Sequence, residues 1–194
     1  MPESKYLKYG AYHWKAYEND ADYRAHVDTV KRFFRSMTKG WLLDAGCGDG
    51  FISEQISQMG FRVVGIDPDA EAVRLARERC NPGIEFAAEA LEDSAKRNSG
   101  PGCPAEPFDY VLMSDVLEYV ADDLAFLRMG ARLSKAGVLA TVQVIDPSNP
   151  GNGERVREYD EPRFTELMVT AFKNVFMFKV GAHLYAWGAG RRGD

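Results

Sequence analysis

Residues 41–50 read Trp-Leu-Leu-Asp-Ala-Gly-Cys-Gly-Asp-Gly. The first five residues are the kind of apolar run that forms a buried strand, and Gly46, Gly48 and Gly50 then interrupt it. A helical pattern of apolar residues follows, as far as Gly60. Glycine lets a backbone turn sharply and approach a ligand closely, while the first turn of a helix offers unpaired N–H groups. We therefore expect a strand, a ligand-binding loop and a helix.

The same alternation of apolar runs and helical patterns continues downstream of this unit. Continuous apolar runs indicate strands buried on both faces, and their alternation with helices is typical of a parallel sheet. After a last helix, two β-rich runs around Gly181 predict a terminal antiparallel hairpin. Clusters of Gly and Pro predict loops at 94–107 and 146–153. The expected strands are 41–45, 62–67, 84–88, 108–113, 138–145, 174–180 and 182–188.

The chain has 194 residues, which suits one compact domain with small additions. Ahead of the first strand lies an aromatic-rich run, followed by an amphipathic helical pattern that ends near Met37. We expect an N-terminal lid and helix at 1–38, followed by a cofactor-binding domain at 39–194. Aromatic side chains in such a lid would shield a bound cofactor from water.

Composition excludes several classes of function. The formal net charge is -5, so the chain carries no excess of positive charge for nucleic acid, and an RNA acceptor is disfavoured. The three cysteines, at 47, 80 and 103, lack the spacing of a zinc site or a disulfide scaffold, which favours a reducing cytoplasm. No apolar run is long enough to span a membrane. Oligomeric state is left open between monomer and homodimer.

Asp44 decides between two kinds of cofactor. The glycine spacing is G-x-G-x-G, whereas the dinucleotide fingerprint is G-x-G-x-x-G. A carboxylate two residues before the first glycine would repel a pyrophosphate, but it suits a ligand with cationic groups. S-adenosylmethionine, which carries an ammonium and a sulfonium, is such a ligand, so Asp44 favours a cationic cofactor over an anionic one. A tight turn without a ligand is the structural alternative.

Two more acids follow the next two predicted strands. Asp67 ends the run Val-Val-Gly-Ile-Asp, and a carboxylate there can accept both hydrogen bonds of a ribose diol. Glu89 follows the third strand, where a backbone N–H or side-chain oxygen can contact an adenine edge. The alternative for Glu89 is a carboxylate favoured by the positive end of a helix.

The segments LLDAGCGDG, VVGID and FAAEALE, followed by SDVLEYV and LSKAGVLATV, resemble the class I S-adenosylmethionine-dependent methyltransferases. The resemblance covers residues 41 to about 145 and is strongest to small-molecule enzymes such as ubiquinone-biosynthesis O-methyltransferases. It implies a Rossmann-like, doubly wound α/β fold whose seven-stranded sheet has the order 3-2-1-4-5-7-6, with the last strand antiparallel. The pattern Gly-Ala-Tyr-His-Trp at 10–14 is also similar to methyltransferases of bacterial polysaccharide clusters.

The resemblance also implies roles for individual residues. The loop around Gly46 and Gly48 corresponds to the methionine-binding loop, Asp67 to the ribose ligand and Glu89 to the adenine-edge segment. The segment 114–120 would border both cofactor and acceptor. Relatives commonly have His where this chain has Tyr119, and that histidine could serve as a metal ligand in some of them. Because it is missing here, we predict no metal. The expected cofactor-binding residues are Asp44, Ala45, Gly46, Cys47, Gly48, Gly50, Phe51, Asp67, Pro68, Glu89, Ala90, Leu91, Ser114 and Tyr119.

We expect methyl transfer to a small or medium-sized acceptor, a hydroxyl of a phenol, quinone precursor or sugar. Three residues are candidate catalytic groups: His13 as a base in the lid, and Asp115 and Glu118 after the fourth strand. Each of them also has a structural alternative, as a packed or capping side chain. The candidate acceptor-binding residues are Tyr12, Trp14, Arg155, Arg157 and Tyr159.

Two other functions stay open at this level. A nicotinamide-dependent oxidoreductase shares the doubly wound architecture, and Asp44 with its glycine spacing argues against it. A non-catalytic partner subunit would keep the fold and the cofactor site. Intact binding residues indicate cofactor binding but not catalysis, so they do not exclude it.

Overall fold

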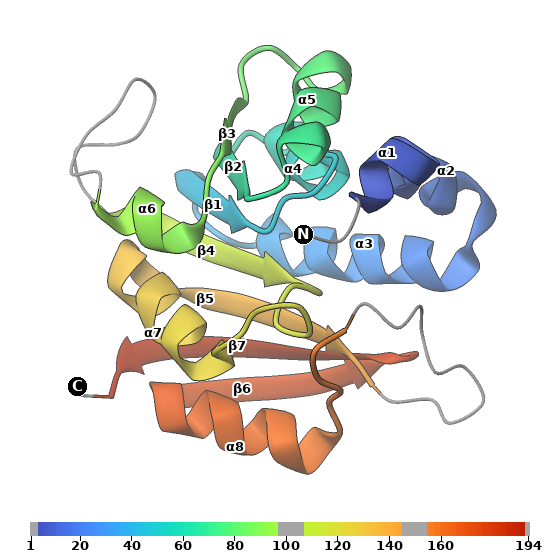
Figure 1. Ribbon diagram of the computed structural model, residues 1–194. Helices are drawn as coiled ribbons and strands as arrows, with labels where there is room; N and C mark the ends of the chain where they lie inside the picture. The colour runs from blue at the N-terminus through green and yellow to red at the C-terminus, as the bar shows by residue number, and fades with distance from the viewer. Residues whose placement is uncertain (1–3, 97–106, 145–154, 193–194) are drawn as a thin grey trace. The chain divides into compact units, whose positions relative to one another are not determined.

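The computed structural model describes residues 4–96, 107–144 and 155–192. Its strands form one seven-stranded sheet in the order β3-β2-β1-β4-β5-β7-β6, which confirms the predicted fold class (Figure 1). The contacts divide the chain into two units, Met1–Glu106 and Pro107–Asp194. The boundary that we predicted between residues 38 and 39 falls inside the first unit and stays a prediction.

The first unit contains three parallel strands. Asp44 of β1 pairs with Gly65 of β2, and Asp67 of β2 pairs with Ala88 of β3, so the carboxyl ends of these strands meet at one edge. In chain order, its elements are α1 (Lys5–Tyr9), α2 (Tyr12–Asn19), α3 (Ala21–Arg35), β1 (Trp41–Ala45), α4 (Phe51–Ser57), β2 (Arg62–Asp67), α5 (Ala70–Arg79), β3 (Glu85–Ala88) and α6 (Leu91–Lys96).

Capping carboxylates determine where two helices of this unit begin. Asp20 accepts hydrogen bonds from the backbone N–H groups of Asp22 and Tyr23 at the start of α3. Asp69 does the same for Glu71 and Ala72 at the start of α5. An N-cap side chain of this kind stabilises a helix by about 1 kcal/mol.

The predicted N-terminal lid forms two short helices, α1 and α2. Gly10 separates them with a φ of 64°, a conformation that favours glycine. Figure 1 shows both helices beside α3 and α5, and Tyr6 of α1 packs with Ala72 and Leu75 of α5. The aromatic run is therefore folded against the first unit.

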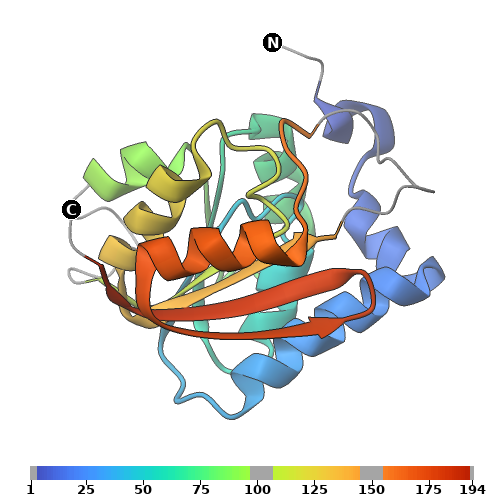
Figure 2. The same ribbon diagram turned by 90° about the horizontal axis from the view of Figure 1, so that it is seen from below.

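The second unit begins with parallel strands β4 and β5 and ends with antiparallel pairs β5–β7 and β6–β7, as predicted. Figure 2 shows α8 lying along the β6–β7 hairpin. Helix α7 packs so closely on β4 that a Cβ added to Gly130 would collide with the Met113 side chain. The elements are β4 (Phe108–Ser114), α7 (Asp123–Leu133), β5 (Ser134–Gln143), α8 (Glu161–Ala171), β6 (Phe172–Val180) and β7 (His183–Arg191).

Several predicted boundaries were wrong. Strand β6 begins at Phe172 instead of 174, and β7 ends at Arg191 instead of 188. Strand β5 begins at Ser134 instead of 138, because Ser134 pairs with Phe108 across a register shift that sequence patterns do not reveal. Helix α6 extends to Lys96, so residues 94–96 are helical where we predicted a loop. Residues 97–106 and the predicted loop at 146–153, like Cys103, lie outside the described residues. Within the described chain, no helix is long and apolar enough to cross a membrane.

Candidate functional site

The glycine-rich loop after β1 adopts the backbone that its sequence requires. Gly46, Gly48 and Gly50 have φ values of 87°, 56° and 78°, a region that residues with a Cβ rarely enter. The backbone N–H groups of Gly46 and Cys47 both donate to the carbonyl of Ile66, at 2.8 and 3.0 Å. These bonds tie the loop to β2 and direct the chain into α4.

Asp44 lies at the end of β1 and is almost completely buried, with 2% of its surface exposed. One of its carboxylate oxygens accepts a hydrogen bond from the Ser53 hydroxyl at 2.6 Å. Burial raises the pKa of Asp44 to about 7, the Ser53 bond lowers it and the nearby Asp67 raises it further. A cation arriving at this carboxylate would favour its ionised form.

Asp67, at the end of β2, binds the glycine-rich loop directly. Its two carboxylate oxygens accept hydrogen bonds from the backbone N–H groups of Gly48, at 3.0 Å, and Asp69, at 2.9 Å. Burial raises the pKa of Asp67, these two bonds lower it, and the positive charge of Lys5 also lowers it. Asp44, Asp67 and the glycine-rich loop therefore lie together at the carboxyl ends of β1 and β2.

Asp49, which we did not predict as a site residue, connects this loop to α2. It has no exposed surface. Its carboxylate accepts the backbone N–H of His13 at 3.0 Å and contacts His13 Nδ1 at 3.1 Å. The Trp14 indole donates to the Asp49 carbonyl at 3.3 Å. Helix α2 has no side-chain cap of its own, so Asp49 supplies that function from the loop.

Helix α1 places Tyr6 directly over the loop. A Cβ added to Gly48 would collide with the Tyr6 hydroxyl and would lie 3.4 Å from the His13 ring. Burial raises the pKa of Tyr6 well above its ordinary value, and the negative charges of Asp67 and Asp49 contribute. Tyr12 stacks on Tyr6 with ring centroids 5.3 Å apart. Gly48 therefore lets an aromatic side chain approach the loop backbone.

The predicted adenine-edge segment follows β3. The Glu89 backbone N–H donates to the carbonyl of Asp67 at 3.0 Å, which joins the two strand ends. Leu91 is buried and begins α6, and Ala90 precedes it. Pro68 follows Asp67 in the chain, and the Phe51 ring meets the Trp14 ring at a centroid distance of 5.1 Å.

The other predicted cofactor residues, Ser114 and Tyr119, belong to the second unit, at and after the end of β4. Asp115, between them, has a φ of 50°, a strained value for a residue with a Cβ. The Thr141 hydroxyl donates to its carboxylate at 2.7 Å, and His183 Nε2 lies 3.0 Å from the other oxygen. The candidate catalytic residue Asp115 is therefore hydrogen-bonded to β5 and β7.

Glu118 is the other candidate catalytic residue after β4, and it has no exposed surface. Its Oε1 accepts the backbone N–H of Gln143 at 2.8 Å, while its Oε2 has no hydrogen-bond partner among the described residues. Burial raises the pKa of Glu118 to about 7, Asp115 raises it further and Arg155 lowers it.

Arg157 and Tyr159, two predicted acceptor-binding residues, both contact the segment that follows β4. Arg157 donates to the carbonyls of Leu117, Val120 and Ala121 at 2.6–3.1 Å. Tyr159 is buried, and its hydroxyl donates to Asp123 at 2.7 Å. Both side chains therefore support the segment after β4, and Arg155, Arg157 and Tyr159 stay predicted acceptor-binding residues.

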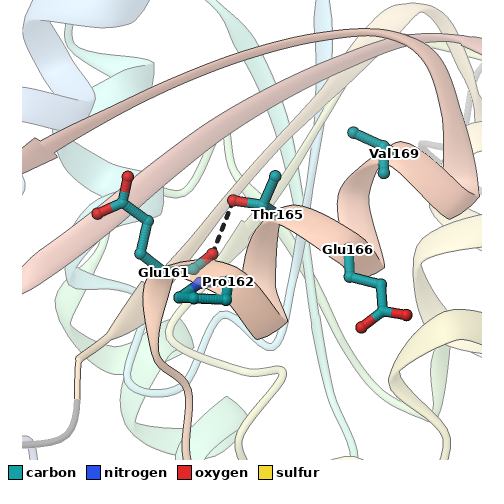
Figure 3. Close-up of a pocket in the computed structure, with 5 residues that line it drawn as sticks. All are labelled: Glu161, Pro162, Thr165, Glu166 and Val169. Atoms are coloured by element: carbon teal, nitrogen blue, oxygen red, sulfur yellow. Dashed lines mark hydrogen bonds between the residues drawn. The ribbon is translucent and has the colours of Figure 1, made fainter.

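A shallow pocket on the outer side of α8 lies apart from the predicted residues of its unit. Figure 3 shows the side chains that line it, with Thr165 donating to the Glu161 carbonyl at 2.7 Å. This bond lies within one turn of the helix, and none of the lining residues is a predicted site residue. The lining residues are Glu161, Pro162, Thr165, Glu166 and Val169.

Comparison with protein families gives a match over most of the chain. A family model described as a methyltransferase domain matches residues 17–175. The ubiquinone biosynthesis O-methyltransferase of Bradyrhizobium sp. (strain ORS 278) is 34% identical over 108 residues, covering 54% of this chain and 40% of that protein. The same enzyme of Nitrobacter winogradskyi is 36% identical over 103 residues, covering 51% of this chain and 36% of that protein. The chain therefore spans about two fifths of the length of these relatives.

Solved structures share the fold. Magnesium protoporphyrin IX methyltransferase from Synechocystis PCC 6803, solved with bound S-adenosylhomocysteine, superposes with a TM-score of 0.64. The match covers 96% of this chain and 100% of that one at 16% identity, which supports the architecture alone.

Proposed function

The chain belongs to the class I S-adenosylmethionine-dependent methyltransferase family, and we propose that it transfers a methyl group to a hydroxyl of a small acceptor. When bound, S-adenosylmethionine supplies an electrophilic methyl on a sulfonium and leaves as S-adenosylhomocysteine. Because the sulfonium is a good leaving group, the protein has mainly to align the reacting atoms and receive the hydroxyl proton.

The buried carboxyl of Asp44 carries this proposal. Burial raises its pKa to about 7, and its hydrogen-bond donor, Ser53, is a neutral hydroxyl. A pyrophosphate beside Asp44 and Asp67 would add negative charge to two acids already held close together, whereas an ammonium and a sulfonium would offset both. This argues against the nicotinamide-dependent oxidoreductase.

The residues at the three strand ends fit the rest of the cofactor. In this proposal Asp67 binds the ribose diol through the lone pairs that its two backbone hydrogen bonds leave available. Glu89, Ala90 and Leu91 contact the adenine edge. The remaining proposed contacts are Ala45, Gly46, Cys47, Gly48, Gly50, Phe51, Pro68, Ser114 and Tyr119.

The position of Tyr6 in α1 limits how closely a cofactor can approach the glycine-rich loop. Its hydroxyl now fills the space that Gly48 leaves open above the loop. In this proposal α1 and α2 line the cofactor after Tyr6 has shifted, with Tyr12 and Trp14 facing the acceptor. Since Asp49 already binds His13, this histidine acts first as the anchor of α2 and is the weaker candidate for a base.

Oxygen is the proposed acceptor atom because the matched relatives are named as O-methyltransferases. A phenol, a quinone precursor or a sugar ring would suit a site that offers Asp115, Glu118 and Arg155. The alternative of a non-catalytic partner subunit would leave these polar residues without a ligand.

Parallel calorimetric titrations with S-adenosylmethionine, S-adenosylhomocysteine and NADH test the cofactor assignment. We expect the first two to bind and NADH not to bind. Binding of NADH alone would contradict the proposal. A search for methyl transfer to catechol and to methyl glucoside, followed by release of S-adenosylhomocysteine, then separates an enzyme from a binding subunit.

A further inference from the structure

Three buried side-chain atoms among the described residues have no hydrogen-bond partner: Glu118 Oε2, Arg155 Nε and Arg128 Nε. Such atoms are uncommon in folded proteins, because leaving one unsatisfied costs about 1–3 kcal/mol. Two of the three belong to one place in the second unit. One is an acceptor, Glu118 Oε2, and the other is a donor, Arg155 Nε.

Both side chains are held by the same residue, Gln143, the last residue of β5. The Gln143 backbone N–H donates to Glu118 Oε1 at 2.8 Å, and its side-chain oxygen accepts from an Arg155 terminal nitrogen. The backbone N–H of Val156, next to Arg155, donates to the Glu118 carbonyl at 2.9 Å. Arg155 is near enough to lower the pKa of Glu118. These contacts place the side chains of Glu118 and Arg155 near each other, on either side of Gln143.

The neighbouring groups favour a proton acceptor at Glu118. Asp115 receives hydrogen bonds from Thr141 and, when the ring nitrogen carries its proton, from His183. The charge of Asp115 raises the pKa of Glu118 and so makes its carboxylate a better proton acceptor.

We propose that Glu118 and Arg155 form a two-point site for a single hydroxyl group, the nucleophile of the methyl acceptor. The hydroxyl donates its hydrogen to Glu118 Oε2 and accepts a hydrogen bond from Arg155 Nε. A methyl ether can accept from Arg155 but has no hydrogen for Glu118, so the site discriminates the acceptor from its methylated product. This inference rests on the proposed methyl transfer.

The chemistry balances with these groups. As the hydroxyl oxygen forms a bond to the methyl carbon, its proton passes to Glu118 Oε2, and the electron pair of the breaking carbon–sulfur bond stays on sulfur. The products are the methyl ether, S-adenosylhomocysteine and a neutral Glu118 carboxyl, which then loses its proton to solvent. Arg155 holds the oxygen lone pair in place and so positions the nucleophile.

Two matched pairs of small probes test this site: phenol with anisole, and cyclohexanol with methoxycyclohexane. The ¹⁵N–¹H signal of Arg155 Nε, assigned by its loss in Arg155→Lys, reports binding to the wild-type protein with and without S-adenosylhomocysteine. In at least one pair, we expect the alcohol to shift this signal. We expect its affinity, measured from the shift, to be about tenfold or more above that of its ether.

Glu118→Gln supplies the second arm, with exposed Glu158→Gln as its matched control. We expect Glu118→Gln to remove most of the preference for the alcohol, and Glu158→Gln to keep it. If neither alcohol is preferred in the wild-type protein, the two-point site is wrong, whatever the Glu118→Gln variant does. Failure of S-adenosylhomocysteine to bind, with the alcohol preference intact, would overturn the proposed function and leave the hydroxyl site standing.

Discussion

Asp44 and Glu118 are both buried carboxyls whose pKa burial raises to about 7, but their surroundings differ. Asp44, in the first unit, accepts a hydrogen bond from the neutral Ser53 and lies near a second acid, Asp67. Glu118, in the second unit, also lies near a second acid, Asp115, but it has Arg155 nearby as well and keeps one oxygen without a described partner. The first arrangement suits a cation from a ligand, and the second suits a hydrogen-bond donor. Similar burial therefore serves two kinds of binding.

The largest effect is expected from Asp44→Asn. The substitution removes the negative charge but keeps the size of the side chain, so it should weaken S-adenosylmethionine binding by roughly 10- to 100-fold, the value of a charge-assisted interaction. 5′-Methylthioadenosine, which lacks the ammonium and sulfonium, should bind almost unchanged. Calorimetry with both ligands checks this, and equal losses for the two would mean that Asp44 does not meet the cation.

Asp67→Ala should give a smaller loss with the opposite selectivity. Because Asp67 is proposed to bind the ribose, which both ligands carry, S-adenosylmethionine and 5′-methylthioadenosine should each weaken about tenfold. Exposed Glu92→Gln is the matched control. A loss confined to S-adenosylmethionine would assign Asp67 to the charged end of the cofactor instead.

Glu118→Gln should change how stability depends on pH. Since the folded-state pKa of Glu118 is raised from 4.5 to about 7, its ionisation costs stability progressively as the pH rises from 4.5, and the full cost is present above 7. The glutamine side chain cannot ionise and does not carry this cost. The free energy of unfolding of the variant, relative to that of wild type, should therefore increase by about 1–3 kcal/mol from pH 5 to pH 8. Urea titrations at both pH values measure this, and a difference that does not grow with pH would contradict it.

The smallest effect is expected at the anchor of α2. Asp49→Ala removes the acceptor for the His13 backbone and ring, which should cost about 1 kcal/mol and speed hydrogen exchange in α2. His13→Ala leaves the backbone bond intact and should do less. Equal exchange rates in the two variants would show that the ring contact alone holds α2.

The sequence predicted the first unit's site better than the second's. Asp44, the glycines and Asp67 stand at strand ends, and strand order brings those ends together, so short-range patterns were sufficient. Asp49 was missed because its partners, His13 and Trp14, lie about 35 residues away in a segment with no pattern that aims them at the loop.

Local patterns named Asp115, Glu118 and Arg155 as candidates in the second unit, but they did not reveal the contacts among them. Gln143 lies within an apolar run that predicts a strand and nothing more, and its pairing with Glu118 and Arg155 depends on tertiary contacts. His183 meets Asp115 across 68 residues. Arg157 was predicted as an acceptor-binding residue from its charge, but the sequence did not reveal that its guanidinium donates to three backbone carbonyls.

The central claim is that the Asp44 carboxylate meets the cation of the cofactor, and proton release measures it most directly. Titrating S-adenosylmethionine at pH 6.5 in two buffers of different ionisation enthalpy gives the number of protons released on binding. With a pKa of about 7, Asp44 is largely protonated in the free protein, so binding should release roughly three-quarters of a proton in wild type and almost none in Asp44→Asn. Equal release from both proteins would contradict the claim.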